Sequence, residues 1–194
     1  MMQSSFLERE QLERMGFAAL GEDVKISSYA RFYGTERIRI GSHVRIDDFC
    51  ILSAGAGGIV IGDYVHLSPY SFLVGQAAIE LHDFTALSWQ AGVFSSSDDF
   101  SGRWLTNPTV PEIYRRPYHA PVRLERHALV GAGSLILPGV TLGEGVAIGA
   151  QSLVTKDCAP FKIYVGMPAR PIKARRQDLL ELERRLRDAQ KGEG

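Results

Sequence analysis

Aliphatic residues recur every six positions along most of the chain. The first residue of each hexad is branched and aliphatic in every case: Ile40, Ile46, Leu52, Ile61, Leu67, Leu73, Leu81, Leu87, Val93, Leu124, Val130, Ile136, Leu142, Ile148 and Val154. The fifth residue of each hexad is small throughout: Val44, Cys50, Ala56, Val65, Ser71, Ala77, Thr85, Ala91, Ser97, Ala128, Ser134, Val140, Val146, Ser152 and Cys158. A six-residue period matches neither an α-helix nor the two-residue alternation of a long strand. It predicts a coil with three short faces per turn, in which both sets of residues point inward.

The spacing between equivalent hexads gives the length of one coil. Leu124 and Leu142 are 18 residues apart, which corresponds to three hexads. Two earlier coils are 21 and 20 residues long, so we expect small insertions at Gly57-Gly58 and near Gln76. Glycine or a short polar residue would supply the turn at each corner, because glycine tolerates positive φ. Neighbouring coils would pair as parallel strands about 4.8 Å apart. The predicted fold class is an all-β solenoid.

Both ends of the chain are expected to be helical. In residues 1–21, Ser5 and Glu8 have the spacing of a capping box, and Gly16 would end the short helix that follows. In residues 175–194, leucines at helical spacing and oppositely charged pairs predict a second helix. They are Leu179, Leu182, Leu186, Glu181–Arg185 and Glu183–Arg187. We expect this helix to cap the solenoid or to pack on a neighbouring subunit, because a bare solenoid end needs a cap.

One stretch resembles a known family. The run VGAGSLILPGVTLGEGVAIGAQSLVTKD, followed by GMPARPIK, is similar to the carboxy-terminal signature of the hexapeptide-repeat acyltransferases. The resemblance covers roughly residues 22–174. It implies a left-handed parallel β-helix, here of about five to six coils with an external loop at 99–120. It also implies an acetyl-CoA or other acyl-CoA co-substrate, no metal, and a homotrimer with active sites between subunits.

A stacked edge of small residues is a candidate cofactor site. Ala132 and Ala150 occupy the same position in successive coils, which would leave backbone groups open to a slim ligand. Tight packing against another subunit would explain the same pattern. The resemblance implies that this edge holds the pantetheine arm of coenzyme A, with Thr155, Lys156 and Arg170 toward its adenine and phosphate end. Those cations suit a phosphate-rich ligand, although solvated surface charge is the alternative interpretation.

The same edge, followed toward the N-terminus, reaches Trp89. The turn from Ser88 to Gln90 would then lie at the level of the thioester. The coil that contains this turn ends at Asp98, where the long loop begins. We therefore expect Ser88 in the catalytic centre, with Trp89 and Gln90 binding the acceptor.

Asp98 decides which nucleophile we expect. The resemblance implies a histidine general base at this position in the sugar O-acetyltransferases, whereas this chain has an aspartate. A hydroxyl acceptor needs a base with a pKa near 7, but an amine is already a nucleophile when neutral. A carboxylate can orient the amine and offset the positive charge that develops on it. Asp98 therefore favours N-acylation, with Asp99 beside it as an acceptor-binding residue, and the nearest branch is the nucleotide-amino-sugar N-acyltransferases. The alternative is that both aspartates only cap a turn.

The loop itself carries aromatic and basic side chains. We expect Trp104 and Tyr114 to stack on a sugar or base and Arg115 to meet a pyrophosphate. The further candidates of the same kinds are Phe100, Tyr118 and Arg116. The alternative role for all of them is to pin the loop to a neighbouring subunit.

Histidines supply the competing hypotheses. His119, at the end of the loop, would be the base of a sugar O-acetyltransferase. A zinc hydratase would need His66, His82 and His127 to converge, but their positions within the hexads differ. His66 is expected to face a corner, like His127. The last alternative is a solenoid without catalysis.

Composition narrows the choice of partners. Lys and Arg together number 22, as do Asp and Glu, so the net charge is zero, and neither nucleic acid nor a membrane surface is an expected partner. The N-terminal segment lacks the apolar stretch of a signal peptide, and no apolar run is long enough to span a bilayer. Two cysteines fit a reducing cytoplasm. The sequence predicts a cytoplasmic acyltransferase that acylates the amino group of a nucleotide-linked sugar for surface polysaccharide.

Overall fold

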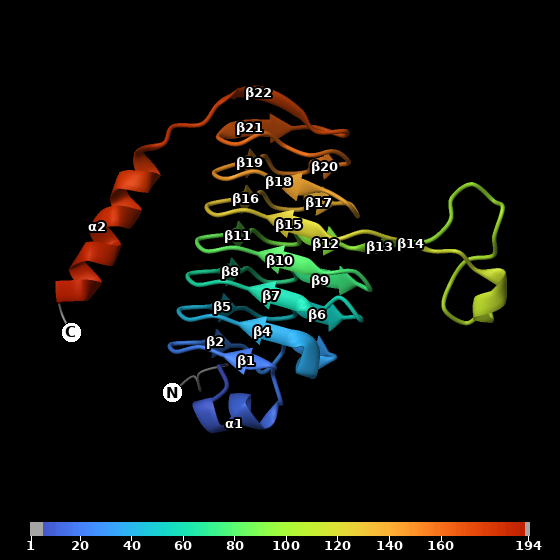
Figure 1. The fold of residues 1–194 in the computed structure, drawn as a ribbon, viewed down its shortest axis with the longest axis horizontal. Coiled ribbons are helices and arrows are strands. Elements are labelled where there is room, and N and C mark those ends of the chain that lie inside the picture. Colours follow the sequence, from blue (N-terminus) through green and yellow to red (C-terminus); the bar gives the residue numbers. More distant parts are fainter. Residues whose placement is uncertain (1–5, 193–194) are drawn as a thin grey trace.

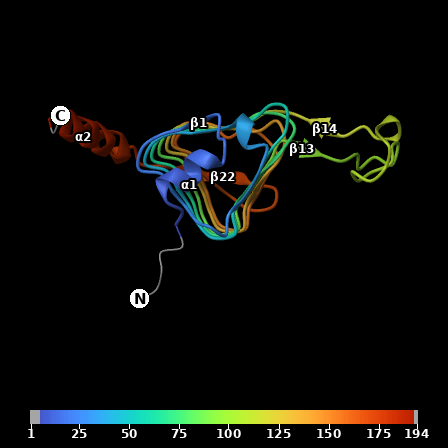
Figure 2. The ribbon, with the colours of Figure 1, turned by 90° about the horizontal axis from the view of Figure 1, so that it is seen from below.

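The computed structural model describes residues 6–192 as a parallel β-solenoid with a helix at either end (Figure 1). Residues 96–119 project from the solenoid, and we call this segment the arm. Three sheets form the faces of a triangular prism (Figure 2). The first sheet contains β1 (Ala19–Leu20), β4 (Ile38–Ile40), β7 (Ile59–Ile61), β10 (Ile79–Leu81), β15 (Val122–Leu124) and β18 (Thr141–Leu142). The second contains β2 (Lys25–Ile26), β5 (Arg45–Ile46), β8 (His66–Leu67), β11 (Ala86–Leu87), β16 (Leu129–Val130), β19 (Ala147–Ile148), β21 (Lys162–Val165) and β22 (Arg170–Ala174). The third contains β3 (Arg31–Tyr33), β6 (Ile51–Ala54), β9 (Phe72–Gly75), β12 (Gly92–Phe94), β17 (Leu135–Ile136) and β20 (Leu153–Val154).

We number the corners in chain order. The first corner joins the first sheet to the second, the second corner joins the second to the third, and the third corner leads to the next coil. Within the described residues, six complete coils precede a partial seventh formed by β21. The prediction of five to six coils had the right class and a slightly low count, because the first coil begins before the hexad pattern becomes regular.

The hexad pattern is confirmed by burial and by register. All fifteen first-position residues lie in strands and are at most 2% exposed. The paired residues are 21 apart between β4 and β7, 20 between β7 and β10, and 18 between β15 and β18. The insertions therefore lie where the spacing predicted them.

Three of the fifteen small fifth positions depart from the prediction. Ala56 is exposed, and Ala77 and Ser97 are half-buried. All three lie at the third corner, where the inserted residues and the arm widen the turn and move these positions out of the core. The remaining members of the set are buried.

The corners differ in part from the expectation that glycine or a short polar residue would supply their turns, because glycines such as Gly133 and Gly145 do so at some corners and large residues do so at others. Many left-handed residues in the described chain are large: Asp23, His43, Phe49, Tyr64, Tyr70, Phe84, Gln90, His127, Gln151 and Phe161. At the first corner, rings from successive coils stack on one another. The centroids of His43 and Tyr64 are 4.5 Å apart, those of Tyr64 and Phe84 4.8 Å, and those of Phe84 and His127 5.0 Å. Ring stacking offsets part of the backbone strain. We call these four residues the ring ladder.

The N-terminal helix α1 (Arg9–Arg14) begins three residues later than predicted. Its N-cap is Glu8, whose side chain forms the capping box with Gln11. Ser5, the predicted cap, lies outside the described residues. Gly16 has a φ of +72° just beyond the helix, as the prediction of its end required.

The C-terminal helix α2 (Asp178–Gly192) lies beside the first corner and does not cover the end of the solenoid (Figure 1). The antiparallel pair β21 and β22 closes the second sheet instead. The predicted pairs Glu181–Arg185 and Glu183–Arg187 are both formed. The expectation that α2 caps the solenoid is therefore wrong. No helix in residues 6–192 is both long and apolar enough to cross a membrane.

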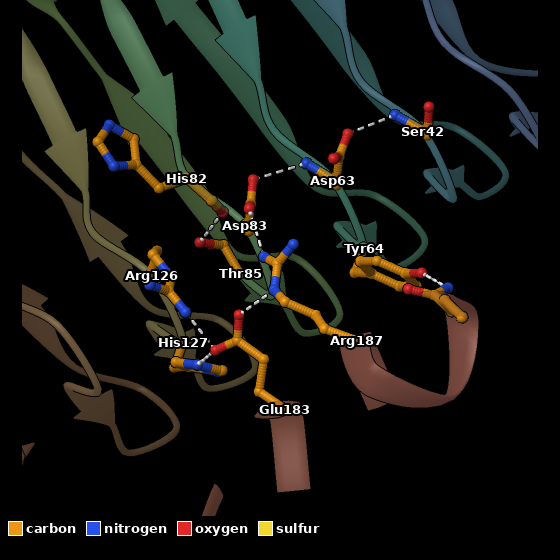
Figure 3. Close-up of polar contacts among 11 residues, drawn as sticks. Ser42, Asp63, Tyr64, His82, Asp83, Thr85, Arg126, His127, Glu183 and Arg187 are labelled. Atoms are coloured by element: carbon orange, nitrogen blue, oxygen red, sulfur yellow. Dashed lines mark hydrogen bonds and ion pairs between the residues drawn. The ribbon is translucent and has the colours of Figure 1, made fainter. Parts of the chain in front are cut away.

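Glu183 fixes α2 to the solenoid (Figure 3). Its carboxylate accepts hydrogen bonds from His127 Nε2 at 2.7 Å, from Arg187 Nε at 2.6 Å and from Arg126. Arg187 also donates to Asp83 at 3.0 Å and lies over the Phe84 ring. The helix is thereby attached to several coils at once.

Candidate active site

The arm leaves the third corner as a two-stranded ribbon (Figures 1 and 2). Strand β13 (Ser96–Ser97) pairs antiparallel with β14 (Tyr118–His119), so that Ser96 faces His119. Ser95, which is fully buried, donates its hydroxyl to the Ala77 carbonyl oxygen at 2.7 Å and holds the base of the arm to the preceding coil. This geometry sets Asp98 directly after the ribbon, close to the body of the solenoid.

A cavity of about 420 Å³ opens at the base of the arm and brings together three predicted site residues. Asp98, Arg115 and His119 all line it, beside Phe94 of β12. His119 Nδ1 is 2.8 Å from Ser96 Oγ, which orients the imidazole. Arg115 Nε is buried, and no hydrogen-bond partner for it is found within the described residues. The cavity thus combines a carboxylate, an imidazole and a guanidinium, and it can hold a polar or anionic ligand.

The two aspartates have different surroundings. The Asp99 carboxylate accepts hydrogen bonds from Ser101 and from the backbone N–H groups of Arg103 and Trp104. These bonds, those from Ser101 first, lower the pKa of Asp99. Asp98 accepts a long bond, 3.3 Å, from the Asn107 N–H. Asp99 therefore shapes the loop, whereas Asp98 keeps accepting capacity toward the cavity.

The two aromatic residues that we expected to stack on the acceptor, Trp104 and Tyr114, lie in different surroundings. Trp104 borders a second cavity of about 540 Å³, which also involves Asp98 and Asp99. Arg116 lies over the Trp104 ring at 5.8 Å. Tyr114 ends the 3₁₀ helix η2 (Glu112–Tyr114) and is 54% exposed. Within one chain, Tyr114 points to solvent and has no ring partner in the described part of the arm.

Ser88, Trp89 and Gln90 lie at the second corner, away from the arm. The register pairs Leu87 with Val130 and Val130 with Ile148. Two residues further along, this register places Trp89, Ala132 and Ala150 one above another, as predicted. The Trp89 carbonyl oxygen accepts from Gly133 and that of Ala132 from Gln151, each at 2.8 Å.

The remaining cofactor candidates are divided between two places. Thr155 and Lys156 follow β20 at the third corner, and both are exposed. Arg170 begins β22, on the second sheet, and is also exposed. Thr155 and Lys156 thus share the third corner with Asp98, whereas Ser88 lies at the second corner. Within one chain, the candidate residues therefore form two half-sites at separate corners.

The three histidines of the hydratase hypothesis do not converge. His66 contacts Asp47, His82 contacts Glu80 and Glu125, and His127 contacts Glu183. His66 lies within strand β8 and not at a corner, contrary to the expectation. The group of His66, Asp47 and Arg45 was missed because the hexad pattern gives no reason to couple outward positions of adjacent coils. In residues 6–192, no group of three or more His, Cys, Asp or Glu side chains is placed to hold a metal.

Comparison with known proteins gives relatives over nearly the whole chain. The chain is 46% identical over 179 residues to the dTDP-4-amino-4,6-dideoxy-D-glucose acyltransferase of Escherichia coli, covering 92% of this chain and 93% of that enzyme. No protein-family model matches the chain.

Solved structures agree with this relationship. AntD, an N-acyltransferase from Bacillus cereus in complex with dTDP and 3-hydroxybutyryl-CoA, is 42% identical and superposes with a TM-score of 0.93, covering 97% of this chain and 100% of AntD. A serine variant of AntD in complex with dTDP-4-amino-4,6-dideoxyglucose and coenzyme A is 41% identical, also with a TM-score of 0.93, over 96% of this chain and 100% of that one. The predicted resemblance is thus confirmed, and the chain belongs to the family of hexapeptide-repeat acyltransferases that use acyl-CoA to acylate the amino group of nucleotide-linked sugars.

Proposed function

We propose that this enzyme transfers an acetyl or related acyl group from acyl-CoA to the 4-amino group of a dTDP-linked 4-amino-4,6-dideoxyglucose, for use in a surface polysaccharide. The relatives that act on or bind this sugar nucleotide support the choice of acceptor. The observation that carries the proposal is the cavity at the base of the arm, where Asp98 is the carboxylate that retains accepting capacity. We place the reaction in the cytoplasm, where acyl-CoA and nucleotide sugars are made.

In this mechanism the neutral amine attacks the thioester carbonyl carbon. The C–N bond forms, the C–S bond breaks, and the coenzyme A thiolate leaves and takes up the proton that the nitrogen loses. Asp98 accepts a hydrogen bond from the amine and offsets the positive charge that develops on nitrogen, which is the electrostatic stabilisation such a step requires. Arg115, with its unpartnered Nε, binds the anionic part of the acceptor.

Ser88 completes the proposed centre from the second corner. The solved AntD variants carry replacements at a serine and at an aspartate that are ten residues apart. Ser88 and Asp98 have the same separation in this chain. We assign the Ser88 hydroxyl to a hydrogen bond with the reacting groups and the exposed Trp89 and Gln90 to the acceptor. Ala132, Ala150, Thr155, Lys156 and Arg170 are assigned to coenzyme A.

We further propose a homotrimer in which each active site lies between two subunits. The arm extends away from its own solenoid (Figures 1 and 2) and exposes large apolar side chains, with Phe100 at 93% and Ile113 at 76%. Aromatic rings line the second corner and are about half exposed: Tyr29, Phe49, Tyr70 and Trp89. A second copy would cover both surfaces and would bring one subunit's Asp98 to its neighbour's Ser88.

Substitution of Asp98 tests the chemistry. Asp98→Asn keeps the size of the side chain but removes its charge, so turnover should fall on the order of 10²-fold with the fold intact. Asp99→Asn is the matched control, because Asp99 makes more hydrogen bonds to the loop than Asp98 does. A fall caused only by loop disorder would be at least as large in Asp99→Asn. The measurement is steady-state kinetics with the dTDP-amino sugar as acceptor. Turnover of Asp98→Asn at the wild-type rate would contradict a catalytic role for Asp98.

Mixed subunits test the shared site. Ser88→Ala and Asp98→Asn chains, denatured together in equal amounts and refolded, would form random trimers. If each site takes Ser88 from one chain and Asp98 from the next, about one quarter of the sites regain both residues. If both residues came from the same chain, mixing would restore no site. Activity of the mixture that stays at the level of the separate variants would therefore overturn the shared site.

A further inference from the structure

His119 differs from the other histidines of the chain in the kind of partner that it contacts. The chain has five histidines, and all of them lie within the described residues. Four contact a carboxylate through a ring nitrogen: His43 with Asp23, His66 with Asp47, His82 with Glu80 and Glu125, and His127 with Glu183. An ionised carboxylate can only accept, so the nitrogen that faces it carries the proton. His119 instead contacts the hydroxyl of Ser96.

A backbone amide determines what the Ser96 hydroxyl can do. The Gln76 N–H donates to Ser96 Oγ at 2.7 Å, and His119 Nδ1 lies 2.8 Å from the same oxygen. Because the N–H can only donate, Ser96 is the acceptor in that bond, and its own hydrogen is left for another group. In residues 6–192, Nδ1 is the one acceptor found for this hydrogen. The hydroxyl therefore donates to Nδ1, and the ring proton of neutral His119 lies on Nε2.

This tautomer makes His119 a hydrogen-bond donor toward the cavity at the base of the arm. His119 lines that cavity, and no partner for its Nε2 is found in the described part of the chain. A general base needs a free lone pair on the nitrogen that faces the substrate. With the proton on Nε2, the imidazole presents an N–H group instead. Protonation of the ring does not change this role, because both nitrogens then donate.

The acceptor of the proposed function offers one group that matches this donor. In a 4-amino-4,6-dideoxyglucose, the carbon that bears the amine lies between a carbon with a hydroxyl and a carbon with a methyl group. Asp98 and Arg115 line the same cavity as His119 and are assigned to the amine and to the anionic part of the acceptor. The hydroxyl next to the amine remains close to Asp98 and can accept a hydrogen bond. The methyl group on the other side cannot.

We propose that Ser96 fixes His119 as an Nε2–H donor and that His119 binds the acceptor hydroxyl next to the amine. Ser96 is then a positioning residue, and His119 determines specificity for the sugar. The inference rests on the proposed function and deepens it, because it states how the enzyme recognises the ring beside the reacting nitrogen. It also gives a role to a histidine in a cavity where the nucleophile needs no base.

The first test compares the dTDP-linked 4-amino-4,6-dideoxyglucose with its analogue that lacks the hydroxyl next to the amine. His119→Ala should raise the KM of the complete sugar about tenfold, with kcat within about threefold, because a hydrogen bond made in both ground and transition states is lost. With the analogue, the KM values of wild type and His119→Ala should agree within about twofold. His119→Gln keeps an N–H donor and should recover most of the loss, although glutamine cannot act as a base.

The second test observes the tautomer itself. Long-range proton–nitrogen NMR spectra of protein with isotope-labelled histidine distinguish the two tautomers at alkaline pH, and the His119 signals are those that disappear in His119→Gln. Wild type and Ser96→Thr should show the Nε2–H form. Ser96→Ala should lose this preference and raise the KM of the complete sugar. Ser97→Ala is the matched control and should change neither, because the hydroxyl of Ser97, the next residue of β13, donates to the Asp98 backbone carbonyl.

The outcomes separate this inference from the function beneath it. Wild-type protein that neither binds nor acylates the dTDP-amino sugar would overturn the proposed function itself. Normal acylation by a protein whose His119 carries its proton on Nδ1 would overturn the inference alone. An equal rise of KM for both acceptors in His119→Ala would do the same, because the effect would not depend on the hydroxyl. If Ser96→Ala does not fold, the wild-type spectrum and the two His119 variants still decide between these outcomes.

Discussion

Replacing Glu183 should release α2 from the solenoid. The Glu183 side chain is 5% exposed, and burial alone would raise its pKa. Hydrogen bonds from Arg187, His127 and Arg126 outweigh burial and lower the pKa of Glu183 from 4.5 to about 2. The charged carboxylate is therefore much more stable with α2 docked than with α2 free.

The pKa gives the size and the pH window of this effect. A fall from 4.5 to about 2 corresponds to about 3 kcal/mol, at about 1.4 kcal/mol per pH unit. Because the pKa is lower in the folded state, this stabilisation is fully present above pH 4.5. It is lost as the pH falls toward 2 and Glu183 takes up a proton. Glu183→Gln lacks the charge at every pH, so its docking equilibrium should be about 10²-fold weaker at neutral pH.

Hydrogen exchange in α2 measures this equilibrium. An undocked helix of this length is marginal in water, so its amides exchange when it leaves the solenoid. Peptides from residues 178–192 should exchange on the order of 10²-fold faster in Glu183→Gln than in wild type at pH 7. The two proteins should converge only as the pH falls to about 2, after correction for intrinsic exchange rates. Glu181→Gln, which loses only exposed pairs with Arg184 and Arg185, is the control and should change little. Equal protection in Glu183→Gln and Glu181→Gln would refute the reasoning.

Three further predictions concern the cofactor, the nucleophile and the core. Arg170→Ala should raise the Kd of acyl-CoA about tenfold by loss of a charge-assisted contact, with the acceptor KM within twofold; an unchanged Kd by calorimetry removes Arg170 from the site. His119→Ala should keep turnover within about threefold, with activity rising through the pKa of the acceptor amine, whereas a loss of 10²–10⁴ would indicate a general base and a hydroxyl acceptor. Leu87→Ala should lower the free energy of unfolding by about 2–5 kcal/mol in denaturant titrations, because Leu87 is fully buried; a loss below about 1 kcal/mol would contradict its place in the core.

The core of the fold was predictable because each face repeats the same small problem. The first hexad position of every strand faces the interior of the prism, so an aliphatic residue is needed there in every coil. The burial of residues such as Leu52 and Ile136 was therefore predicted correctly from spacing alone. The burial of Ala56 was predicted wrongly, because an insertion changes the path of the chain locally without changing the type of residue.

The corners were less predictable because stacking competes with backbone preference. A left-handed backbone favours glycine, and a side chain there costs on the order of 1 kcal/mol or more. At Tyr64 and Phe84, ring stacking offsets part of that strain, because the two ring centroids lie 4.8 Å apart in adjacent coils at an interplanar angle of 1°. Such a gain exists only after the coils have stacked. A reader of the sequence could have detected it only as rings recurring about once per coil at one hexad position.

The site was partly predictable for the same geometric reason. Register alone placed Trp89 in line with Ala132 and Ala150 on one edge of the solenoid. The interruption of the hexad repeat indicated Asp98. What spacing along one chain does not reveal is contact between corners. Ser88 and Asp98 are ten residues apart, which is more than one face and less than one full coil. In a triangular prism two such positions lie at different corners, so no change of rotamer within one chain joins them. If both residues act in one centre, as we propose, their meeting requires a second copy whose arm reaches the neighbouring corner, and the proposed catalytic centre then exists only in the assembly.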